Sequence, residues 1–452
     1  MSKKVMILIG LFLISNMLLG AEKYAVLITG DYADERGNFE GSWAIANGRD
    51  IERTSMEEFW NDTFLMWEML LEKGYADSSI FVLFAGGQDF QDDYILEGER
   101  YIVPEALEPM TDYQADLENV EMVLEGLAIG NPQENIPQLQ EDDFLYIWTF
   151  DHGYLHDGHT WLGLINEEEI RDDTFGNLVD QINCQKKVIF MQQCHSGGFV
   201  PYLENYQTVI YTATSDSNWA LSSDSLYYDG IDFPGDPDPG NSYGANEWDE
   251  WSDHEYLHGE YNLHILNAIK GETPDYSNIY QTEYGDFPLE DADLNFDNII
   301  SIYEASEWNR LLNSWQWLYN WAAPPGVGTW DNPQYSDLGE IGETTSLEYP
   351  NMILSDITTS QTLQGIMAIP MDLSVSSGVT LTIADNSKVY LLNESQLTIE
   401  EEASLIIGDN VSFYGDGETI NNCGFISITS NETTIFNNSH FEYCNLINSN
   451  GN

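Results

Sequence analysis

The stretch VIFMQQCHSGGF, residues 188–199, is the most informative part of this sequence. Its first half is an apolar run typical of a buried strand, and its second half places a cysteine and a histidine before two glycines. The chain has 452 residues and four cysteines, Cys184, Cys194, Cys423 and Cys444. Four are too few for a disulfide framework in a chain of this length, so Cys194 serves either packing or chemistry.

Strands and helices are expected to alternate around this stretch, from residue 23 to residue 271. Apolar, β-rich runs predict strands at 23–30, 78–87, 142–153, 186–194 and 207–216. Helical spacing of apolar residues predicts helices at 59–75, 118–130, 170–182 and 259–271. This alternation predicts an α/β fold whose mostly parallel sheet carries helices on both faces.

Two polar motifs follow two of these strands, DHG at residues 151–153 and QQCHSGG at 192–198. Sites in such sheets form beyond the carboxyl ends of the strands, and neighbouring strands lie only about 4.8 Å apart. His152 can therefore lie near Cys194 and accept its proton. The backbone amides of Gly153 and Cys194 are candidate donors to an oxyanion.

These residues also allow structural and metal-binding interpretations. A single cysteine is most often a packing residue, but the pairing of two strand ends, each followed by glycine, favours catalysis. His195 is expected to point away from Cys194 and to be solvated or at the substrate's edge. His152, His156 and His159 could instead bind zinc, but Gly153 and Gly158 disfavour the helix that would align two of them.

Residues 23–271, with NPQYSD at 332–337, resemble the clan of cysteine peptidases that includes caspases, legumains and gingipains. The opening stretch YAVLITGDY and the later stretch VIYTATSDSNWA resemble the legumain branch, family C13, especially its bacterial members. The resemblance implies a caspase-like fold, a His152–Cys194 dyad, oxyanion donors at Gly153 and Cys194, and Gln192 as a substrate-binding residue of the S1 pocket. Legumains have glutamate at this last position, so asparagine specificity is not implied here.

The segment DLNFDNIISIYE, residues 293–304, has the ligand spacing of an EF-hand loop. The predicted calcium ligands are Asp293, Asn295, Asp297, the carbonyl of Ile299, Ser301 and Glu304. Asn298 replaces the usual glycine of the turn, which asparagine tolerates because it adopts positive φ more readily than most residues. A helix follows but none precedes, which predicts a dockerin-like half-hand with structural Ca²⁺. No organic cofactor is expected.

Beyond residue 346 the composition shifts to Ser, Thr, Asn and aliphatic residues. Short apolar runs alternate with turn residues, and LTI occurs at 381–383 and 397–399. This predicts an all-β region, solenoid-like in preference to a small sandwich. The predicted boundaries are therefore 1–21 signal peptide, 22–285 peptidase domain, 286–325 calcium loop and helix, 326–345 linker, and 346–452 β-rich region.

The formal net charge of −63, from 77 acidic and 14 basic residues, makes nucleic acid and anionic membranes poor partners. Residues 1–21 have two lysines, a short apolar run and small residues, typical of an export signal rather than a membrane anchor. We therefore expect a secreted or cell-surface cysteine endopeptidase acting on peptides or proteins through an acyl-enzyme. The alternatives are a transamidase using the same dyad and a non-enzymatic adhesion protein, and the sequence does not indicate an oligomeric state.

Overall fold

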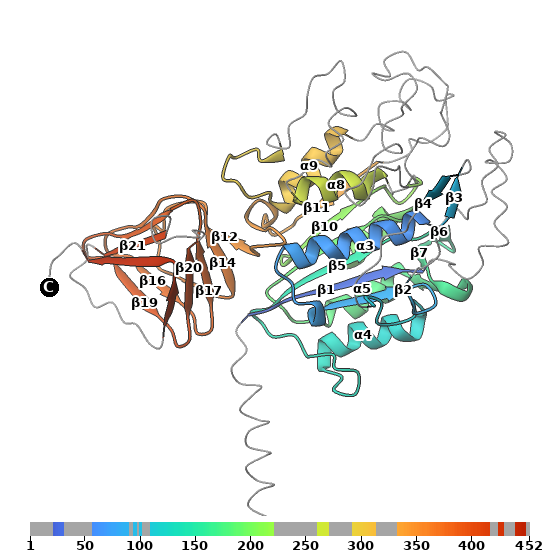
Figure 1. Ribbon diagram of the computed structural model, residues 1–452, viewed down its shortest axis with the longest axis horizontal. Coiled ribbons are helices and arrows are strands. Elements are labelled where there is room, and N and C mark those ends of the chain that lie inside the picture. Colours follow the sequence, from blue (N-terminus) through green and yellow to red (C-terminus); the bar gives the residue numbers. More distant parts are fainter. Residues whose placement is uncertain are drawn as a thin grey trace, which may run out of the picture.

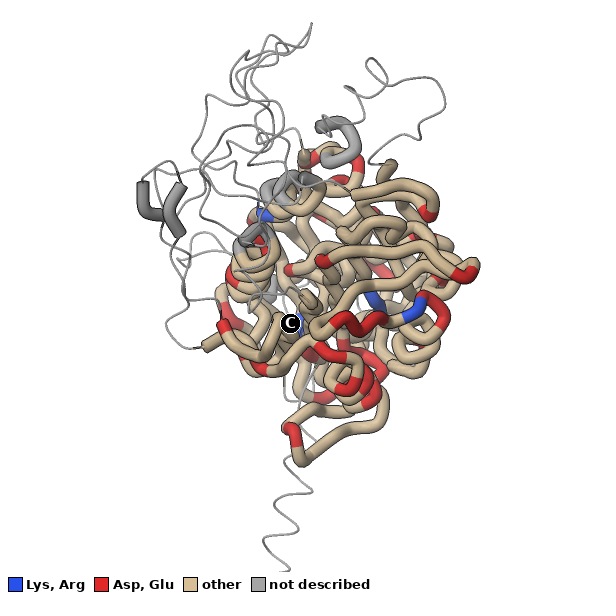
Figure 2. Tube along the Cα trace, turned by 90° about the vertical axis from the view of Figure 1, so that its right-hand side faces the viewer, with Lys and Arg blue, Asp and Glu red and all other residues tan. Residues whose placement is uncertain are grey.

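The computed structural model describes residues 21–30, 57–89, 94–96, 99–101, 109–220, 260–270, 292–312, 332–415, 424–428 and 439–448. Among these, no helix is long and apolar enough to cross a membrane. The expected signal peptide lies outside the described residues except for Ala21. Acidic residues are spread along the described chain, and Lys and Arg are rare (Figure 2).

A six-stranded sheet organises the N-terminal part of the chain (Figure 1). Its strands, in spatial order, are β11 (Gln334–Ser336), β10 (Thr208–Thr212), β9 (Lys186–Met191), β5 (Phe144–Thr149), β1 (Lys23–Thr29) and β2 (Ile80–Phe84). All neighbours are parallel except β10 and β11. The predicted mostly parallel sheet is confirmed, and its five predicted strands are β1, β2, β5, β9 and β10.

Helices cover both faces of this sheet, as predicted (Figure 1). One face packs against α3 (Glu57–Glu72), α8 (Glu260–Lys270) and α9 (Ile302–Leu312), and the other against α4 (Leu117–Ile129), α5 (Asp172–Asp180) and α6 (Val200–Leu203). Alternation along β5 divides its side chains between the two cores: Tyr146 and Trp148 face the first, and Leu145 and Ile147 the second. Fully burying each such side chain stabilises the fold by roughly 1.5–3 kcal/mol.

A buried polar chain fixes β5 within the first core. The indole Nε1 of Trp148 donates to Asn262 Oδ1 at 3.0 Å, and Asn262 Nδ2 donates to Asp62 Oδ2 at 2.6 Å. Trp148, Asn262 and Asp62 are each fully buried, so these polar groups satisfy one another away from water. These two hydrogen bonds tie β5 to α8 and α3 just before the DHG motif.

Smaller elements surround the central sheet. A three-stranded antiparallel sheet follows the DHG motif, made of β6 (Gly153–His156), β7 (His159–Gly163) and β8 (Glu169–Arg171). A hairpin of β3 (Tyr94–Leu96) and β4 (Glu99–Tyr101) follows β2, and short 3₁₀ helices lie at η2 (Asp77–Ser79), η3 (Ile165–Glu167), η4 (Ser196–Phe199) and η6 (Gly342–Thr344). The sequence patterns did not predict β6, β7 and β8, because these strands are too short and too polar to show a period.

The expected linker at 326–345 also contributes to the central sheet. Residues 334–336 form β11, which pairs antiparallel with β10 through Tyr335 opposite Tyr211. Three residues are too short a run for an alternation pattern to identify a strand. The segment is therefore partly the edge of the first sheet rather than a free connection.

The C-terminal strands form three parallel sheets beside the first part of the chain (Figure 1). They are β12 (Asn351–Met352), β14 (Ile366–Ile369), β17 (Lys388–Leu391), β20 (Ser412–Gly415) and β22 (His440–Glu442) in one sheet. The second has β13 (Gln361–Leu363), β16 (Thr380–Ile383) and β19 (Ser404–Ile407), and the third β15 (Leu373–Val375), β18 (Gln396–Ile399), β21 (Gly424–Ile428) and β23 (Cys444–Asn448).

The register of these sheets gives a repeat of 24 residues over much of the region, as in the pairs Leu373–Leu397 and Leu381–Leu405. The two LTI motifs therefore occupy different sheets, in β16 and β18, and do not mark equivalent positions. An LTI pattern satisfies any strand that alternates between core and surface, so it recurs at more than one position of the repeat. The paired leucines lie in one continuous apolar core.

Candidate active site

His152 and Cys194 follow neighbouring strands at the same level. The parallel register of β5 and β9 pairs Thr149 with Met191. His152 and Cys194 each lie three residues beyond this last pair, after the two strands have ended. The structure thus brings both predicted catalytic residues to the carboxyl edge of the sheet, which is where ligands bind in open sheets of this kind.

Gly153 lies directly against the backbone of Cys194. A Cβ atom at Gly153 would overlap the carbonyl oxygen of Cys194 and would lie 2.7 Å from its carbonyl carbon and 3.0 Å from its amide nitrogen. Only glycine allows this approach, since real Cβ contacts are longer than 3.0 Å. The two residues predicted to supply oxyanion donors therefore contact each other through their main chains.

The imidazole of His152 is held by aromatic neighbours. Its ring lies edge-on to Phe59 of α3, with centroids 5.9 Å apart, and Phe59 in turn packs on Phe150 at 4.6 Å. Tyr154 of β6 lies on another side, with centroids 6.5 Å apart. The His152 residue keeps exposed area, yet crowding by protein atoms desolvates the ring and lowers its pKa. The neutral imidazole, which can accept a proton, is thereby favoured.

Cys194 is partly buried in a loop that hydrogen bonds fix from several directions. Its Sγ lies 3.5 Å from the carbonyl oxygen of Ala220, to which the thiol donates. The amide of His195 donates to Asn218 at 2.9 Å, and the amide of Gly197 to Thr214 at 2.9 Å. The loop after β9 is therefore anchored to the segment that follows β10.

His195 is not the solvated residue that the sequence predicted. It is 9% exposed, has a positive φ of 59°, and its Nδ1 lies 3.0 Å from the carbonyl oxygen of Asp216. Strand alternation does not apply to it, because β9 ends at Met191 and the chain turns before His195. It is a structural residue of the loop that carries Cys194.

Asp151 is a buried carboxyl group next to His152 that sequence analysis missed. Its Oδ1 accepts a hydrogen bond from the backbone amide of His152, and its Oδ2 is buried beside Gly30. Burial raises its pKa to about 7, although the amides of His152 and Gly30 oppose that rise. An ionisable residue at the end of an otherwise apolar strand, as in YIWTFD, was the available signal.

Gln192 lies one residue past β9. Its backbone amide donates to Thr149 at 2.9 Å, and its side chain is completely buried with neither the amide oxygen nor the amide nitrogen hydrogen-bonded. The side chain thus has unused hydrogen-bonding capacity two residues before Cys194. Its assignment to an S1 pocket stays a prediction.

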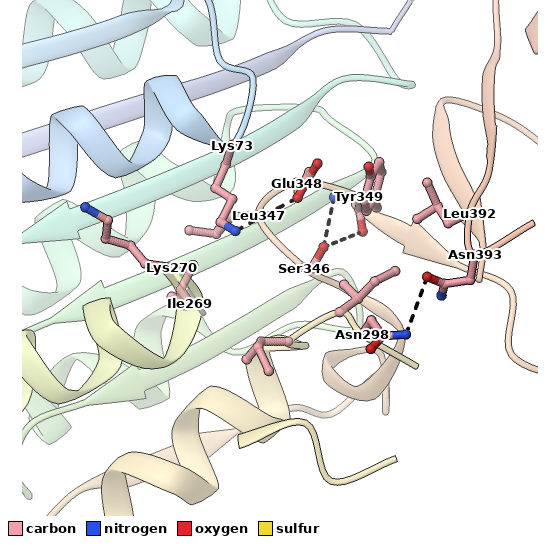
Figure 3. A pocket seen from close by; sticks show the side chains of 12 residues that line it. Lys73, Ile269, Lys270, Asn298, Ser346, Leu347, Glu348, Tyr349, Leu392 and Asn393 are labelled. Atoms are coloured by element: carbon pink, nitrogen blue, oxygen red, sulfur yellow. Dashed lines mark hydrogen bonds and ion pairs between the residues drawn. The ribbon is translucent and has the colours of Figure 1, made fainter. Parts of the chain in front are cut away.

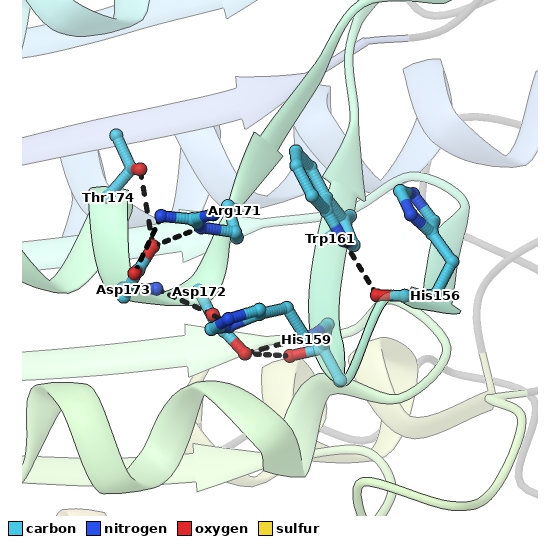
Figure 4. Close-up of polar contacts among 8 residues, drawn as sticks. His156, His159, Trp161, Arg171, Asp172, Asp173 and Thr174 are labelled. Carbon is cyan, nitrogen blue, oxygen red and sulfur yellow. Dashed lines mark hydrogen bonds and ion pairs between the residues drawn. The ribbon is translucent and has the colours of Figure 1, made fainter.

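The remaining histidines of the DHG region do not gather around His152. His156 of β6 bonds Glu169 at 2.9 Å. His159 of β7 bonds Asp172 at 2.7 Å (Figure 4). Among the described residues, the one group of three potential metal-ligating side chains within 4.8 Å is His159, Asp172 and Asp173. Asp173 there forms an ion pair with Arg171, which already neutralises its charge.

The predicted calcium loop lies just before α9 and is folded around its acidic side chains. The carboxylate of Asp293 accepts from the amides of Asp297 at 3.1 Å and Asn298 at 2.7 Å. The carboxylate of Glu304 accepts from the amides of Asn295 at 3.2 Å and Ser301 at 2.9 Å. Side chains from both ends of the loop therefore accept hydrogen bonds from its backbone.

Two observations fit this loop to a calcium ion. Asp297 is 3% exposed and its Oδ2 has no hydrogen-bond partner, while the raised pKa of about 6 reflects first its burial and then repulsion by Glu304 and Asp293. The predicted donors are all oxygen atoms, which Ca²⁺ prefers. Asn298 has φ 63°, the left-handed conformation expected of it in the turn.

The sequence profile of the peptidase C13 family matches residues 62–286. Among solved structures, the chain is similar to the Drosophila initiator caspase Dronc, with 10% identity, a TM-score of 0.33, and coverage of 70% of this chain and 80% of that one. No curated protein matches the sequence. Through residues 62–286, this chain belongs to the peptidase C13 family, a legumain-like branch of the clan CD cysteine peptidases.

Proposed function

We propose that the protein is a secreted cysteine endopeptidase whose nucleophile is Cys194 and whose general base is His152. The observation that carries this proposal is the main-chain contact of Gly153, the residue after His152, with Cys194 beyond the paired ends of β5 and β9. Family membership supports a cysteine peptidase. The expected substrate is a peptide or protein.

In the proposed reaction, His152 accepts the proton of the Cys194 thiol as Sγ attacks the scissile carbonyl carbon. The negative charge that develops on the carbonyl oxygen is stabilised by the amides of Gly153 and Cys194. The tetrahedral intermediate then collapses: the C–N bond breaks, His152 donates its proton to the departing amine, and an acyl-enzyme remains. Water, deprotonated by His152, hydrolyses that thioester and restores the thiol.

The charges around the site favour a neutral resting dyad. The lowered pKa of His152 disfavours the imidazolium that would stabilise a thiolate at Cys194. The strongly acidic protein also disfavours the negative charge of that thiolate. Proton transfer is therefore coupled to substrate docking. Asp151 contacts the backbone of His152 rather than its imidazole, so it positions this residue and does not complete a triad.

We also propose that loop 293–304 binds structural calcium through Asp293, Asn295, Asp297, the Ile299 carbonyl, Ser301 and Glu304. The ion would supply positive charge for the three carboxylates, of which Asp297 and Glu304 are buried. The loop leads into α9, whose Ile302, Ala305 and Trp308 lie in the core of the peptidase domain. Calcium would therefore act on stability and not on the reaction itself.

The C-terminal region is proposed to be a β-solenoid, because its three parallel sheets share one apolar core and repeat at 24-residue register. Export rests on the sequence of residues 1–21 alone.

The peptidase proposal is tested by peptide cleavage with purified Cys194→Ala and His152→Ala. Both variants should lose activity by several orders of magnitude while keeping the circular dichroism spectrum of the wild type. Cys184→Ala is the matched control: Cys184 is buried, its pKa is raised to about 12 by burial, and it bonds the Lys186 carbonyl. Retention of activity by Cys194→Ala would reject the proposal.

A further inference from the structure

The calcium loop forms hydrogen bonds with the turn between β17 and β18 of the C-terminal sheets. Asn393, between β17 and β18, donates from Nδ2 to the carbonyl oxygen of Asp297 at 2.9 Å and to that of Pro370 at 3.1 Å. Asn298 Nδ2 donates to Asn393 Oδ1 at 3.4 Å. One side chain of the β-rich region thus bonds two consecutive residues of the loop and a residue of its own sheets.

Apolar contacts reinforce this junction. Ile299 of the loop is 8% exposed and lies in a separate small core with Met352, Ala368 and Leu392 of the C-terminal region. Ile299 is also the residue whose carbonyl is a predicted calcium ligand. Its side chain therefore packs on the β-rich region while its main chain belongs to the metal loop.

A cavity of about 270 Å³ lies beside these contacts, lined by the end of α8, the loop, residues 346–349 and the Leu392–Asn393 turn (Figure 3). Its two lysines are already paired with acidic groups: Lys73 lies 3.9 Å from Glu348, and Lys270 lies 3.6 Å from Glu72 of α3. The cavity therefore offers no uncompensated charge to a ligand. It lies between the loop and the Leu392–Asn393 turn, so it leaves space for these two segments to shift.

A second set of contacts holds the C-terminal region independently of the loop. Lys186, at the start of β9, donates from Nζ to Thr345 Oγ1 at 2.9 Å and to the Pro350 carbonyl at 2.8 Å. Lys388 pairs with Glu22 at 3.1 Å. The region is thus anchored near its first residues and at the start of β17, and the loop contact adds a hold on the turn that follows β17.

We propose that loop 293–304 is a calcium-dependent latch that fixes the C-terminal sheets against the peptidase domain through Asn393. The inference rests on the proposed calcium binding and adds that metal loading and docking are coupled. Without a cation, Asp293, Asp297 and Glu304 repel one another, and the carbonyl that accepts from Asn393 belongs to one of them. Calcium binding and docking of the C-terminal sheets must then favour each other by the same factor, because linkage is reciprocal.

The test compares Asn393→Gly with Asn410→Gly in the full chain. Both asparagines are exposed and have positive φ, 53° and 59°, so glycine removes the side chain without backbone strain at either. Asn410 bonds Asn386 within its own region at 3.3 Å. Calcium affinity measured by titration calorimetry should fall about fivefold or more in Asn393→Gly and stay at the wild-type value in Asn410→Gly.

Hydrogen exchange gives the reciprocal readout. Removing calcium from the wild type should speed exchange in residues 388–396, and Asn393→Gly should show that fast exchange with calcium present. Equal calcium affinity in both variants, with exchange at 388–396 unchanged by calcium, would overturn the latch while leaving the metal site intact. A wild type that binds no calcium would overturn the latch and the calcium proposal together, and neither result bears on the His152–Cys194 proposal.

Discussion

Gly153 and Cys194 are in main-chain contact, although 40 residues separate them along the chain, and this contact leaves no room for a side chain at Gly153. The contact joins the residue after His152 to the nucleophile itself. Backbone packing therefore sets the distance between the two motifs in space. The glycine of the DHG motif allows the two strand ends to lie this close together.

Replacing Gly153 with alanine should cut kcat/KM for peptide cleavage by about a hundredfold or more, since small displacements of reacting groups have effects of that order. The added Cβ would push the Cys194 carbonyl and amide away from their positions. Steady-state kinetics provides the measurement. Gly158→Asn is the control, because Gly158 has nothing within 4 Å of its Cβ position and asparagine tolerates its φ of 79°. Equal activity of Gly153→Ala and the control would show that the contact does not matter.

Asp151 should make the peptidase domain less stable as pH rises from about 4 to about 7. Its folded pKa is raised to about 7, so over this range the folded state keeps a proton that the unfolded state has lost, and unfolding becomes easier with increasing pH. Above the folded pKa the loss is complete. Asp151→Asn lacks this titration, so its stability relative to wild type should rise by about 2 kcal/mol between pH 5 and pH 7.

Urea unfolding at the two pH values measures this difference. Asp157→Asn, an exposed change in the same hairpin region, should give the same relative stability at both. A relative stability of Asp151→Asn that is independent of pH would mean that the buried carboxyl does not titrate in this range.

Glu304→Gln should lower the melting temperature in calcium to nearly that of the chelated wild type. Glu304 is 3% exposed, and both its carboxylate oxygens accept backbone hydrogen bonds of the loop. A site that binds only the folded state stabilises it by about 2.7 kcal/mol at a hundredfold excess over its dissociation constant. Glu307→Gln, one turn along α9, should keep the wild-type response. Calcium-loaded wild type whose melt is unaffected by chelator would contradict a stabilising role.

The sequence was sufficient for the five parallel strands of the central sheet because they are apolar and separated by well-marked helices. His152 and Cys194 could be found because parallel strands bring their carboxyl ends to one edge, whatever the details of packing. The Asn298 turn could also be predicted, since it depends on the residue's own conformational preference.

What could not be predicted depends on contacts between distant segments. The only local signal of Asp151 is its place after an apolar strand, and its burial depends on Gly30 and His152, which surround it. His195 was predicted to be solvated, but its contacts with Asp216 and Asn218 bury it. The pairing of Tyr335 with Tyr211 and the bonds of Asn393 likewise join segments whose local sequences carry no signal of their meeting.

The central claim, that Cys194 is the nucleophile and His152 its base, is tested most directly by covalent labelling with a peptidyl acyloxymethyl ketone followed by peptide mass spectrometry. The account predicts modification at Cys194, none at Cys184, and a labelling rate at least about a hundredfold lower in His152→Ala, because general-base catalysis contributes factors of that order. Modification at another cysteine, or an undiminished rate in His152→Ala, would contradict it.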